Sequence, residues 1–367
     1  MDLAPYLKLM VEKDASDLYF SSGAPVSIKV EGVTSHLGET PLTPGTVKGL
    51  AYSIMNDEQV RSFEHQLEMD LAFAVAELGR FRINVFRQRG EVAMVVRYIR
   101  HEIPPIEALN LPLILKDLVM EPRGLILVVG TTGSGKSTTL ASMIDYRNEH
   151  KTGHILTIED PIEYSHRHKR SIVNQREVGV DTRSYSDALR RAMREAPDVI
   201  LIGEIRDRET MEQAIAYAET GHLCLSTLHA TNASQTLQRI VNFFPESAHK
   251  KLYMDLAFQL TAIVSQRLLM GRDEKRVPAV EILLQSPYIR ELIQNGQIDQ
   301  VKEVMEKATE LGMHTFDQAL FDLYSGGRIS EDEALRYADS RHNLSVRIRL
   351  SKGGRLPGEY HHEGEPG

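Results

Sequence analysis

The stretch LILVVGTTGSGKSTTL, from Leu125 to Leu140, constrains the fold of this chain more than any other feature of the sequence. Its apolar run ends at Gly130, and the residues from Gly130 to Ser137 have the phosphate-loop spacing G-x-x-x-x-G-K-[ST]. Glycines allow backbone N–H groups to converge on phosphate oxygens, and a helix that starts there turns its positive end toward the anion. The stretch therefore predicts a strand, a loop and a helix of an α/β fold that binds a nucleoside triphosphate.

Individual residues of this loop have predicted roles. Lys136 is expected to reach the β- and γ-phosphates, and the hydroxyl of Ser137 is expected to bind Mg²⁺. A flexible glycine turn between a strand and a helix is the alternative interpretation of the pattern. The predicted nucleotide-binding residues are Gly130, Thr131, Thr132, Gly133, Ser134, Gly135, Lys136, Ser137 and Thr138.

Chain length and cysteine content bound the class of protein. A chain of 367 residues is too long for one ordinary hydrophobic core, so two domains are expected. Its single cysteine, Cys224, excludes an internal disulfide and a multi-cysteine zinc site, and its apolar neighbours predict a buried, inert thiol. No apolar run approaches the roughly 18 residues of a membrane span, and the first residues lack a signal-peptide pattern. We therefore expect a cytoplasmic protein without an integral membrane segment.

Residues 1–100 are predicted to form a small α+β domain, because short alternating stretches with strand periodicity are separated there by turn glycines. The expected strands are Asp17–Phe20, Val26–Val30, Met69–Val75, Arg80–Phe86 and Val92–Ile99, and the expected helices are Thr46–Met55 and Asp57–Glu68. Pro104, Pro105 and Pro112 interrupt both periodicities, so a linker is expected over residues 101–115.

Residues 116–350 are predicted to form a second domain in which strands and helices alternate. The expected strands are Gly124–Gly130, His154–Ile158, Asp198–Ile202 and Leu223–Leu228, and the chain after Ile289 is expected to be helical. Continuous apolar strands between helices indicate a buried, largely parallel sheet with ligands at the carboxyl ends of its strands. Residues 351–367 are rich in glycine, histidine and glutamate and are expected to form a disordered tail.

Two segments place carboxylates directly after an apolar strand. ILTIEDPIEY carries Glu159, Asp160 and Glu163, and PDVILIGEIRD carries Glu204. Nucleotide hydrolysis needs a carboxylate near Mg²⁺ and another group to orient or deprotonate the attacking water. The usual Walker B aspartate is replaced by Gly203, so Glu204 is expected to support the metal through water. A helix-capping role is the alternative for Glu159.

The segment TGHLCLSTLHATNASQT places His222 before an apolar strand and His229 after it. A neutral imidazole could donate a hydrogen bond to the γ-phosphate or position water. The spacing equally allows two ordinary hydrogen-bonded histidines, and it gives no support for a metal site.

Taken in order, these motifs resemble a known family. GTTGSGKSTT, TIEDPIEY, DVILIGEIRD and GHLCLSTLHATNA match the Walker A, Asp-box, atypical Walker B and His-box segments of the type IV pilus retraction ATPases, PilT and PilU. The resemblance covers about residues 5–350 and places the chain within the secretion-ATPase superfamily. Four ordered motifs with unrelated chemistry are far more specific than any one of them.

The resemblance implies a PAS-like N-terminal domain, a RecA-like ATPase domain and a homohexameric ring that hydrolyses ATP with Mg²⁺. It implies that Glu163 is the general base, that Glu204 supports Mg²⁺, and that His222 and His229 form the His-box pair. In the family, arginines of the N-terminal domain approach phosphates bound between the two domains. The matching candidates here, expected to contribute to catalysis, are Arg82 in GRFRINVF and Arg97 in VVRYI.

The resemblance also implies partners: a PilT-type ATPase and an inner-membrane platform protein of the PilC kind, at the cytoplasmic face of the pilus machine. PilT proteins carry an AIRNLIRE segment needed for retraction, whereas this chain has YIRELIQN at Tyr288–Asn295. The phrases VNQREVGVDT, APDVILIGEIRDRETM and NFFP are closer to PilU. We therefore expect a PilU-type accessory motor for pilus retraction and twitching motility.

The alternative function is a RecA-like nucleic-acid translocase. It would call for a basic loop stripe or interleaved aromatic residues, and this chain has a net charge of −8 and no tryptophan. A small-molecule kinase would leave the His box and the N-terminal domain without a role. A catalytically silent subunit would show defects at Lys136, Glu163 or Glu204, and all three are intact.

Overall fold

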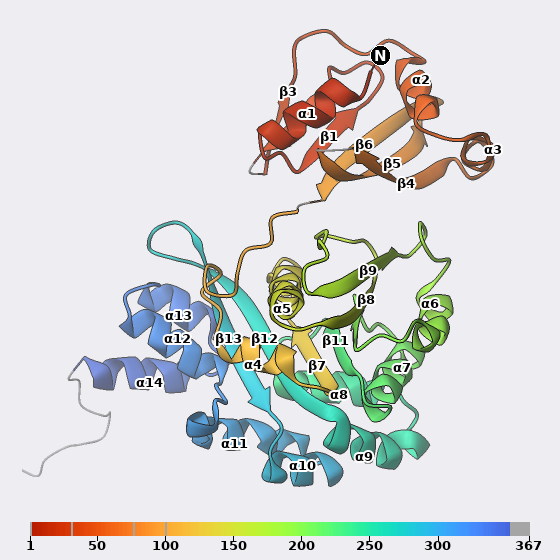
Figure 1. Ribbon diagram of the computed structural model, residues 1–367. Coiled ribbons are helices and arrows are strands. Elements are labelled where there is room, and N and C mark those ends of the chain that lie inside the picture. The colour runs from red at the N-terminus through yellow and green to blue at the C-terminus, as the bar shows by residue number, and fades with distance from the viewer. Residues whose placement is uncertain (1, 31, 76–77, 100, 353–367) are drawn as a thin grey trace, which may run out of the picture. The chain divides into compact units, whose positions relative to one another are not determined.

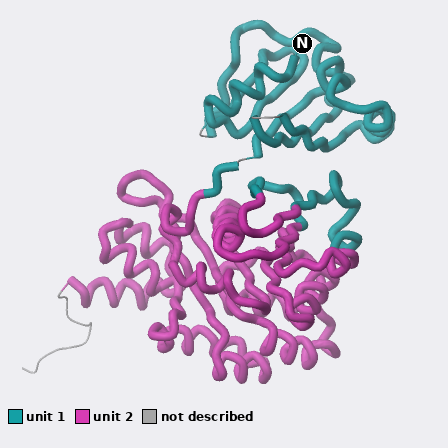
Figure 2. Tube along the Cα trace, in the orientation of Figure 1, with its two compact units in different colours: residues 1–103, 158–167, 175–188 teal, residues 104–157, 168–174, 189–367 magenta. Residues whose placement is uncertain are grey.

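The computed structural model describes residues 2–30, 32–75, 78–99 and 101–352, and of the tail expected over residues 351–367 only the first two fall within this range. Two compact units are distinguished in Figure 2. Unit 1 consists of Met1–Ile103, Ile158–Arg167 and Gln175–Ala188. Unit 2 consists of Pro104–Thr157, His168–Asn174 and Leu189–Gly367.

The N-terminal part of unit 1 is built on a six-stranded antiparallel sheet with the strand order β3-β2-β1-β6-β5-β4 (Figure 1). Its strands are β1 (Asp17–Phe20), β2 (Ser27–Val30), β3 (Val33–His36), β4 (Glu68–Val75), β5 (Gly79–Gln88) and β6 (Glu91–Ile99). Its helices are α1 (Ala4–Glu12), α2 (Thr46–Ser53) and α3 (Asp57–Gln66).

Alternation along the strands determines which face of this sheet is buried. In β5, Phe81, Ile83 and Val85 are fully buried, whereas the residues between them are polar and only partly buried. The five predicted strands and two predicted helices are confirmed. Helix α1 and strand β3 were not predicted, because β3 is exposed along its whole length and α1 buries only two residues.

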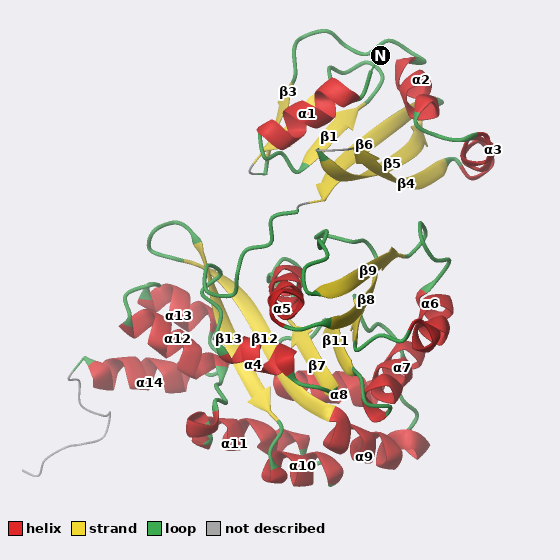
Figure 3. Ribbon diagram, in the orientation of Figure 1, coloured by secondary structure: helices red, strands yellow, loops and turns green. Residues whose placement is uncertain are grey.

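The larger sheet has seven strands in the order β13-β12-β7-β11-β10-β8-β9 (Figure 3). Its strands are β7 (Gly124–Val129), β8 (Gly153–Glu159), β9 (Ser171–Glu177), β10 (Val199–Ile202), β11 (Leu223–Leu228), β12 (Leu260–Met270) and β13 (Arg276–Leu284). Strands β12, β7, β11 and β10 run parallel, and β13 is antiparallel to β12. Every residue of β7, β10 and β11 is buried, which confirms the predicted parallel core. Strands β9, β12 and β13 were not predicted.

Helices precede and separate the strands of this sheet, and the chain after β13 is helical. They are α4 (Ile114–Met120), α5 (Lys136–His150), α6 (Tyr185–Ala192), α7 (Arg208–Glu219), α8 (Ala233–Asn242), α9 (His249–Gln259), α10 (Pro287–Gln294), α11 (Val301–Lys307), α12 (Phe316–Ser325), α13 (Glu331–Tyr337) and α14 (Arg341–Ser351). Residues of α4 and α5 share a hydrophobic core with Ile126 and Val128 of β7. Helices α12, α13 and α14 form a further core against β12 and β13. Among the described residues, no helix combines the length and the apolar character that crossing a membrane requires.

Candidate nucleotide-binding site

The predicted phosphate loop connects β7 to α5 in unit 2. Gly130, Gly133 and Gly135 have φ values of +156°, +77° and +90°, in the region that favours glycine. A Cβ atom at Gly130 would lie 2.3 Å from the Ser134 hydroxyl oxygen and 2.5 Å from the Gln266 carbonyl oxygen. Glycine is therefore required there by both backbone conformation and space.

The start of α5 provides the donors for an anion. This helix has 15 residues, and its N-cap, Gly135, offers no side chain to the first backbone N–H groups. The Lys136 ammonium donates hydrogen bonds of 3.0 Å to the carbonyl oxygens of Gly130 and Thr131. These contacts hold the lysine over its own loop, where phosphate oxygens could replace the carbonyls as acceptors.

Gln266 of β12 packs against the phosphate loop, a role that was not predicted from the sequence. Its side-chain oxygen accepts a 2.7 Å hydrogen bond from the Thr139 hydroxyl, and it is only 4 % exposed. A Cβ atom at Gly135 would lie 2.9 Å from the Gln266 side-chain nitrogen. The signal in the sequence is the polar SQR that interrupts the apolar run LTAIVSQRLLM.

Glu204 follows β10 in a turn that β11 holds in place. The Thr227 hydroxyl donates to the Gly203 carbonyl oxygen at 2.7 Å, and the Ile205 N–H donates to the Thr227 carbonyl oxygen at 2.9 Å. Thr227 therefore fixes the backbone on both sides of Glu204. This role of Thr227 was not predicted either, because the contact joins two strands that lie far apart in the sequence.

The structure brings Glu204 and His229 together. The His229 Nε2 atom lies 3.1 Å from one Glu204 carboxylate oxygen, and the Arg206 Nε atom lies 2.7 Å from the other. The Glu204 side chain is only 16 % exposed, whereas those of His229 and Arg206 are 41 % and 57 % exposed, so the carboxylate is more sheltered from water than its two partners. A carboxylate, an imidazole and a guanidinium thus meet at the carboxyl ends of β10 and β11.

His222 lies at the opposite end of β11 from His229, so within one chain the structure does not bring the two histidines together at the phosphate loop. The His222 carbonyl oxygen accepts a hydrogen bond from the N–H of Gly124, the first residue of β7. The phosphate loop begins after Val129, the last residue of β7, and so lies at the other end of that strand. Its ring Nδ1 lies 3.0 Å from the Thr220 hydroxyl and 3.2 Å from the Tyr217 carbonyl oxygen. Because β11 has six residues, about 20 Å separate its ends, and within one chain His222 does not join His229.

The predicted Mg²⁺ ligands have suitable chemistry. Mg²⁺ prefers oxygen ligands and usually combines one or two carboxylates with substrate phosphates and water. Ser137, in the first turn of α5, offers a hydroxyl, and Glu204 offers a largely buried carboxylate. The described residues contain no cluster of three histidine, cysteine or acidic side chains that could hold a metal without such phosphates.

Glu163 lies in unit 1, in the loop between β8 and β9, and its side chain is exposed. Gln175 holds this loop: its amide donates to the Tyr164 carbonyl oxygen at 2.9 Å, and its side-chain oxygen accepts from the His166 N–H at 2.7 Å. The Gln175 amide also donates to Glu159 at 3.3 Å. No helix begins in this loop, so the capping alternative for Glu159 is wrong.

Arg82 and Arg97 are direct cross-strand neighbours on β5 and β6. The Arg82 Nη2 atom donates to Asp70 at 3.2 Å, and its Nε atom lies 3.8 Å from a carboxylate oxygen of Glu177. The Arg97 Nε atom donates to the buried Asp17 at 2.8 Å, while most of the Arg97 side chain is exposed. The sheet thus presents two guanidinium groups side by side on its polar face.

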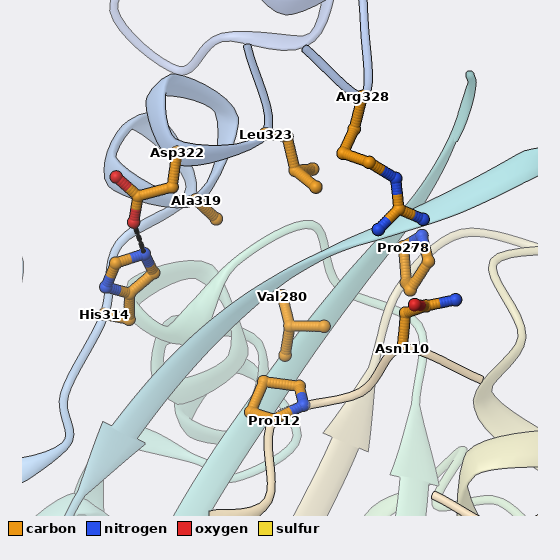
Figure 4. A pocket seen from close by; sticks show the side chains of 9 residues that line it. All are labelled: Asn110, Pro112, Pro278, Val280, His314, Ala319, Asp322, Leu323 and Arg328. Atoms are coloured by element: carbon orange, nitrogen blue, oxygen red, sulfur yellow. Dashed lines mark ion pairs between the residues drawn. The ribbon is translucent and has the colours of Figure 1, made fainter. Parts of the chain in front are cut away.

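A separate cavity of about 250 Å³ lies beside the predicted linker in unit 2 (Figure 4). Asn110 and Pro112 of the linker line it together with Val280 of β13. At its rim, the His314 Nε2 atom lies 3.2 Å from Asp322, and burial lowers the pKa of His314 while Asp322 opposes that shift. None of the predicted site residues lines this cavity, but it shows that the end of the linker is packed on unit 2.

Cys224 is fully buried, and burial raises the pKa of its thiol, which confirms the prediction of an inert cysteine.

Comparison with known proteins decides the family. The family model described as "Type II/IV secretion system protein" matches residues 2–316. The chain belongs to this family. The type IV pilus ATPase PilU of Pseudomonas aeruginosa is 49 % identical over 95 % of this chain and 92 % of its own length. The "Type IV pilus retractation ATPase PilT" of the same organism is 43 % identical over 94 % of this chain and its own full length.

A crystal structure of the pilus retraction motor PilT with bound ADP has the same fold. It has a TM-score of 0.87 and 44 % identity and covers 94 % of this chain and 99 % of its own. Membership of the secretion ATPase family, within its PilT and PilU relatives, confirms three predictions: the RecA-like α/β fold, the smaller N-terminal α+β domain, and an ATPase that binds a nucleotide.

Proposed function

We propose that this chain is a hexameric, ATP-hydrolysing motor that powers type IV pilus retraction and twitching motility as a PilU-type accessory motor. One observation carries the proposal: the chain is 49 % identical to a PilU over 95 % of its length. We further propose the expected domains: a PAS-like domain over residues 1–100, a linker over 101–115 and an ATPase domain over 116–350.

The phosphate loop binds the ATP phosphates through its backbone N–H groups, at residues 130–138. Lys136 exchanges its two carbonyl acceptors for β- and γ-phosphate oxygens and thereby neutralises charge there. The geometry of Gly130 supports this role, because a side chain there would collide with the Ser134 hydroxyl and with the Gln266 carbonyl oxygen of β12 and so displace the loop.

Ser137 would bind Mg²⁺ directly and Glu204 would bind it through water. When bound, the ion neutralises the charge that develops on the phosphates. The His229 Nε2 atom lies 3.1 Å from the Glu204 carboxylate, and an N–H there donates to it. In a neutral imidazole this is the single N–H, so Nδ1 is left to accept a hydrogen bond from water and orient it. Donation to the γ-phosphate would require that N–H to leave Glu204. His222 has no such role within its own chain.

Glu163 removes a proton from the water that attacks the γ-phosphorus, and its carboxylate holds that proton as the bond between this phosphorus and the oxygen of the departing ADP breaks. Its exposed side chain and the hydrogen bonds that hold its loop support this role. Arg82 and Arg97 stabilise charge on the phosphates. An arginine of this kind is worth about 10³ to 10⁵ in rate in other nucleotide hydrolases.

Hydrolysis would drive motion of the N-terminal domain about the linker. Because Asn110 and Pro112 are packed on unit 2, the hinge is expected among the residues before Asn110. The partners that we propose are five further copies of the chain, a PilT-type ATPase and an inner-membrane platform protein of the PilC kind. The proposed location is cytoplasmic, at the inner membrane.

The test has a biochemical and a cellular part. The purified chain should form hexamers by light scattering and hydrolyse ATP with Mg²⁺, and Lys136→Ala should abolish binding or turnover. In piliated cells, deletion of the gene should impair twitching, measured with and without the PilT-type partner present. Stimulation of hydrolysis by single-stranded DNA would favour the translocase alternative, and absence of Mg-ATP hydrolysis in the hexamer would refute the proposal.

A further inference from the structure

Glu177, the last residue of β9, is a buried acid for which the proposed mechanism has no use. Its side chain is only 1 % exposed. One carboxylate oxygen accepts a 3.4 Å hydrogen bond from the Ile162 N–H, and the other has no hydrogen-bond partner among the described residues. Burying a carboxylate with so few hydrogen bonds is costly, so a role for its charge is expected.

The only cation within ion-pair distance of this carboxylate, among the described residues, is Arg82. The Arg82 Nε atom lies 3.8 Å from the oxygen of Glu177 that lacks a hydrogen bond. Arg82 also donates from Nη2 to Asp70, whose side chain is 39 % exposed. Nε and Nη2 form one edge of the planar guanidinium, so both carboxylates contact the same edge. The N–H groups of Nη1 lie outside that edge and have the geometry to donate to a second anion.

The turn after β9 reinforces this arrangement. The Glu177 carbonyl oxygen accepts from the Asp181 N–H at 2.8 Å, and the Asp181 carboxylate accepts from the Glu177 N–H at 2.9 Å. Asp181 also accepts from Arg80, two residues before Arg82 on the same face of β5, at 3.4 Å. Two carboxylates of one hydrogen-bonded turn therefore meet two arginines of one strand.

We propose that Glu177 is a positioning residue that orients Arg82 toward the nucleotide phosphates and, through the Ile162 N–H, also fixes the loop that carries Glu163. Ile162 is the residue directly before Glu163, so one carboxylate connects the proposed general base to the proposed phosphate arginine. This inference rests on the proposed function, in which Arg82 and Glu163 act on the γ-phosphate and its attacking water.

Electrostatics support the pairing. Burial raises the pKa of Glu177, while the Ile162 hydrogen bond and the charges of Arg82 and Arg80 lower it. The arginines therefore keep this buried acid ionised more than burial alone would allow. In return, the buried anion adds to the Asp70 hydrogen bond an attraction for Arg82 that water screens less than it screens an exposed pair.

The test uses ATP hydrolysis by the full-length hexamer. Glu177→Gln keeps the shape and an oxygen acceptor for the Ile162 N–H but removes the charge that holds Arg82. We expect kcat to fall by about tenfold to a hundredfold, as for a misplaced catalytic group, with the KM for ATP changed by less than about threefold. The matched control, Glu68→Gln, changes an exposed glutamate of β4 in the same unit and should leave both constants unchanged.

A double-mutant cycle separates positioning from a merely structural role. In an Arg82→Ala background, adding Glu177→Gln should change kcat by less than about twofold, because its target is already absent. Binding of a fluorescent ADP analogue and the melting temperature check that each variant is folded. If Glu177→Gln fails that check, Glu177→Asp, which retains the charge, takes its place with a smaller expected loss.

An unchanged kcat in Glu177→Gln, or full additivity with Arg82→Ala, overturns the inference. An unchanged kcat in Arg82→Ala, with wild-type hydrolysis intact, overturns the inference and the role of Arg82 but leaves the ATPase function standing. Failure of the wild-type hexamer to hydrolyse ATP refutes the proposed function itself, so the two failures are distinguishable.

Discussion

Glu281 should make the stability of unit 2 depend on pH, and the size of the effect follows from its surroundings. The side chain lies on β13 and is only 2 % exposed. Its carboxylate accepts hydrogen bonds from the Ala233 N–H at 2.7 Å and the Ser265 hydroxyl at 3.1 Å, which anchor the start of α8. Burial raises the pKa of Glu281 to about 7, a shift that Asp339 increases and these hydrogen bonds only partly oppose.

The sign of the effect follows from proton uptake on folding. Above the ordinary pKa of 4.5 the unfolded chain loses the proton, whereas the folded chain keeps it up to a pKa of about 7. The contribution of Glu281 to stability is therefore greatest below pH 4.5 and is lost as the pH rises from there through 7. The whole difference is worth about 3 kcal/mol, and most of it falls between pH 5 and pH 8.

Glu281→Gln removes this dependence, because an amide does not ionise and its oxygen still accepts both hydrogen bonds. Its NH₂ group adds a cost that is the same at every pH, so the comparison across pH isolates the ionisation. Relative to wild type, the variant should gain about 5–10 °C in melting temperature between pH 5 and pH 8. Circular dichroism melts of the full chain measure this, with the exposed Glu310→Gln as control. An equal pH dependence in wild type and Glu281→Gln would refute the argument.

Two further predictions concern the site. Glu163→Gln should still bind nucleotide but lower turnover by at least about a hundredfold, as expected when a general base is lost; its side chain is exposed, so folding should be unaffected. Near-normal hydrolysis would remove Glu163 from the mechanism. Gly130→Ala should weaken nucleotide binding by at least about tenfold, because its Cβ would lie 2.3 Å from the Ser134 hydroxyl and displace the loop. Gly49→Ala, in α2 with open space around it, is the matched control, and equal affinity in both variants by calorimetry would contradict this account.

Local patterns predicted the elements whose signals are complete within a few residues. Strands β7, β10 and β11 are buried on both faces, so their apolar runs stand out in the sequence. The alternation of β5 likewise identified a half-buried strand. Strand β3 carries no such signal, because all of it is exposed. Strand β9 also escaped prediction, since its SIVNQRE mixes polar and apolar residues.

The candidate site also contains features that local sequence encodes and features that depend on the register of distant strands. The phosphate loop depends on backbone conformation and on a helix start, and both are encoded by neighbouring residues. The contact of His229 with Glu204 depends on strands β10 and β11 lying in parallel register, and the same register carries His222 to the far end of β11. Spacing along the chain treated the two histidines alike, because it does not state which end of the sheet each residue reaches.

The sequence alone determined that this chain binds a nucleotide on a glycine loop and which family of motors it resembles, because those signals are local and their motifs lie in a distinctive order. Only the tertiary structure decided that Gln266 supports that loop, that Thr227 holds the Glu204 turn and that Glu177 meets Arg82. Each of these contacts joins residues that are distant in the chain. Strand order and register, which local patterns do not encode, bring them within reach.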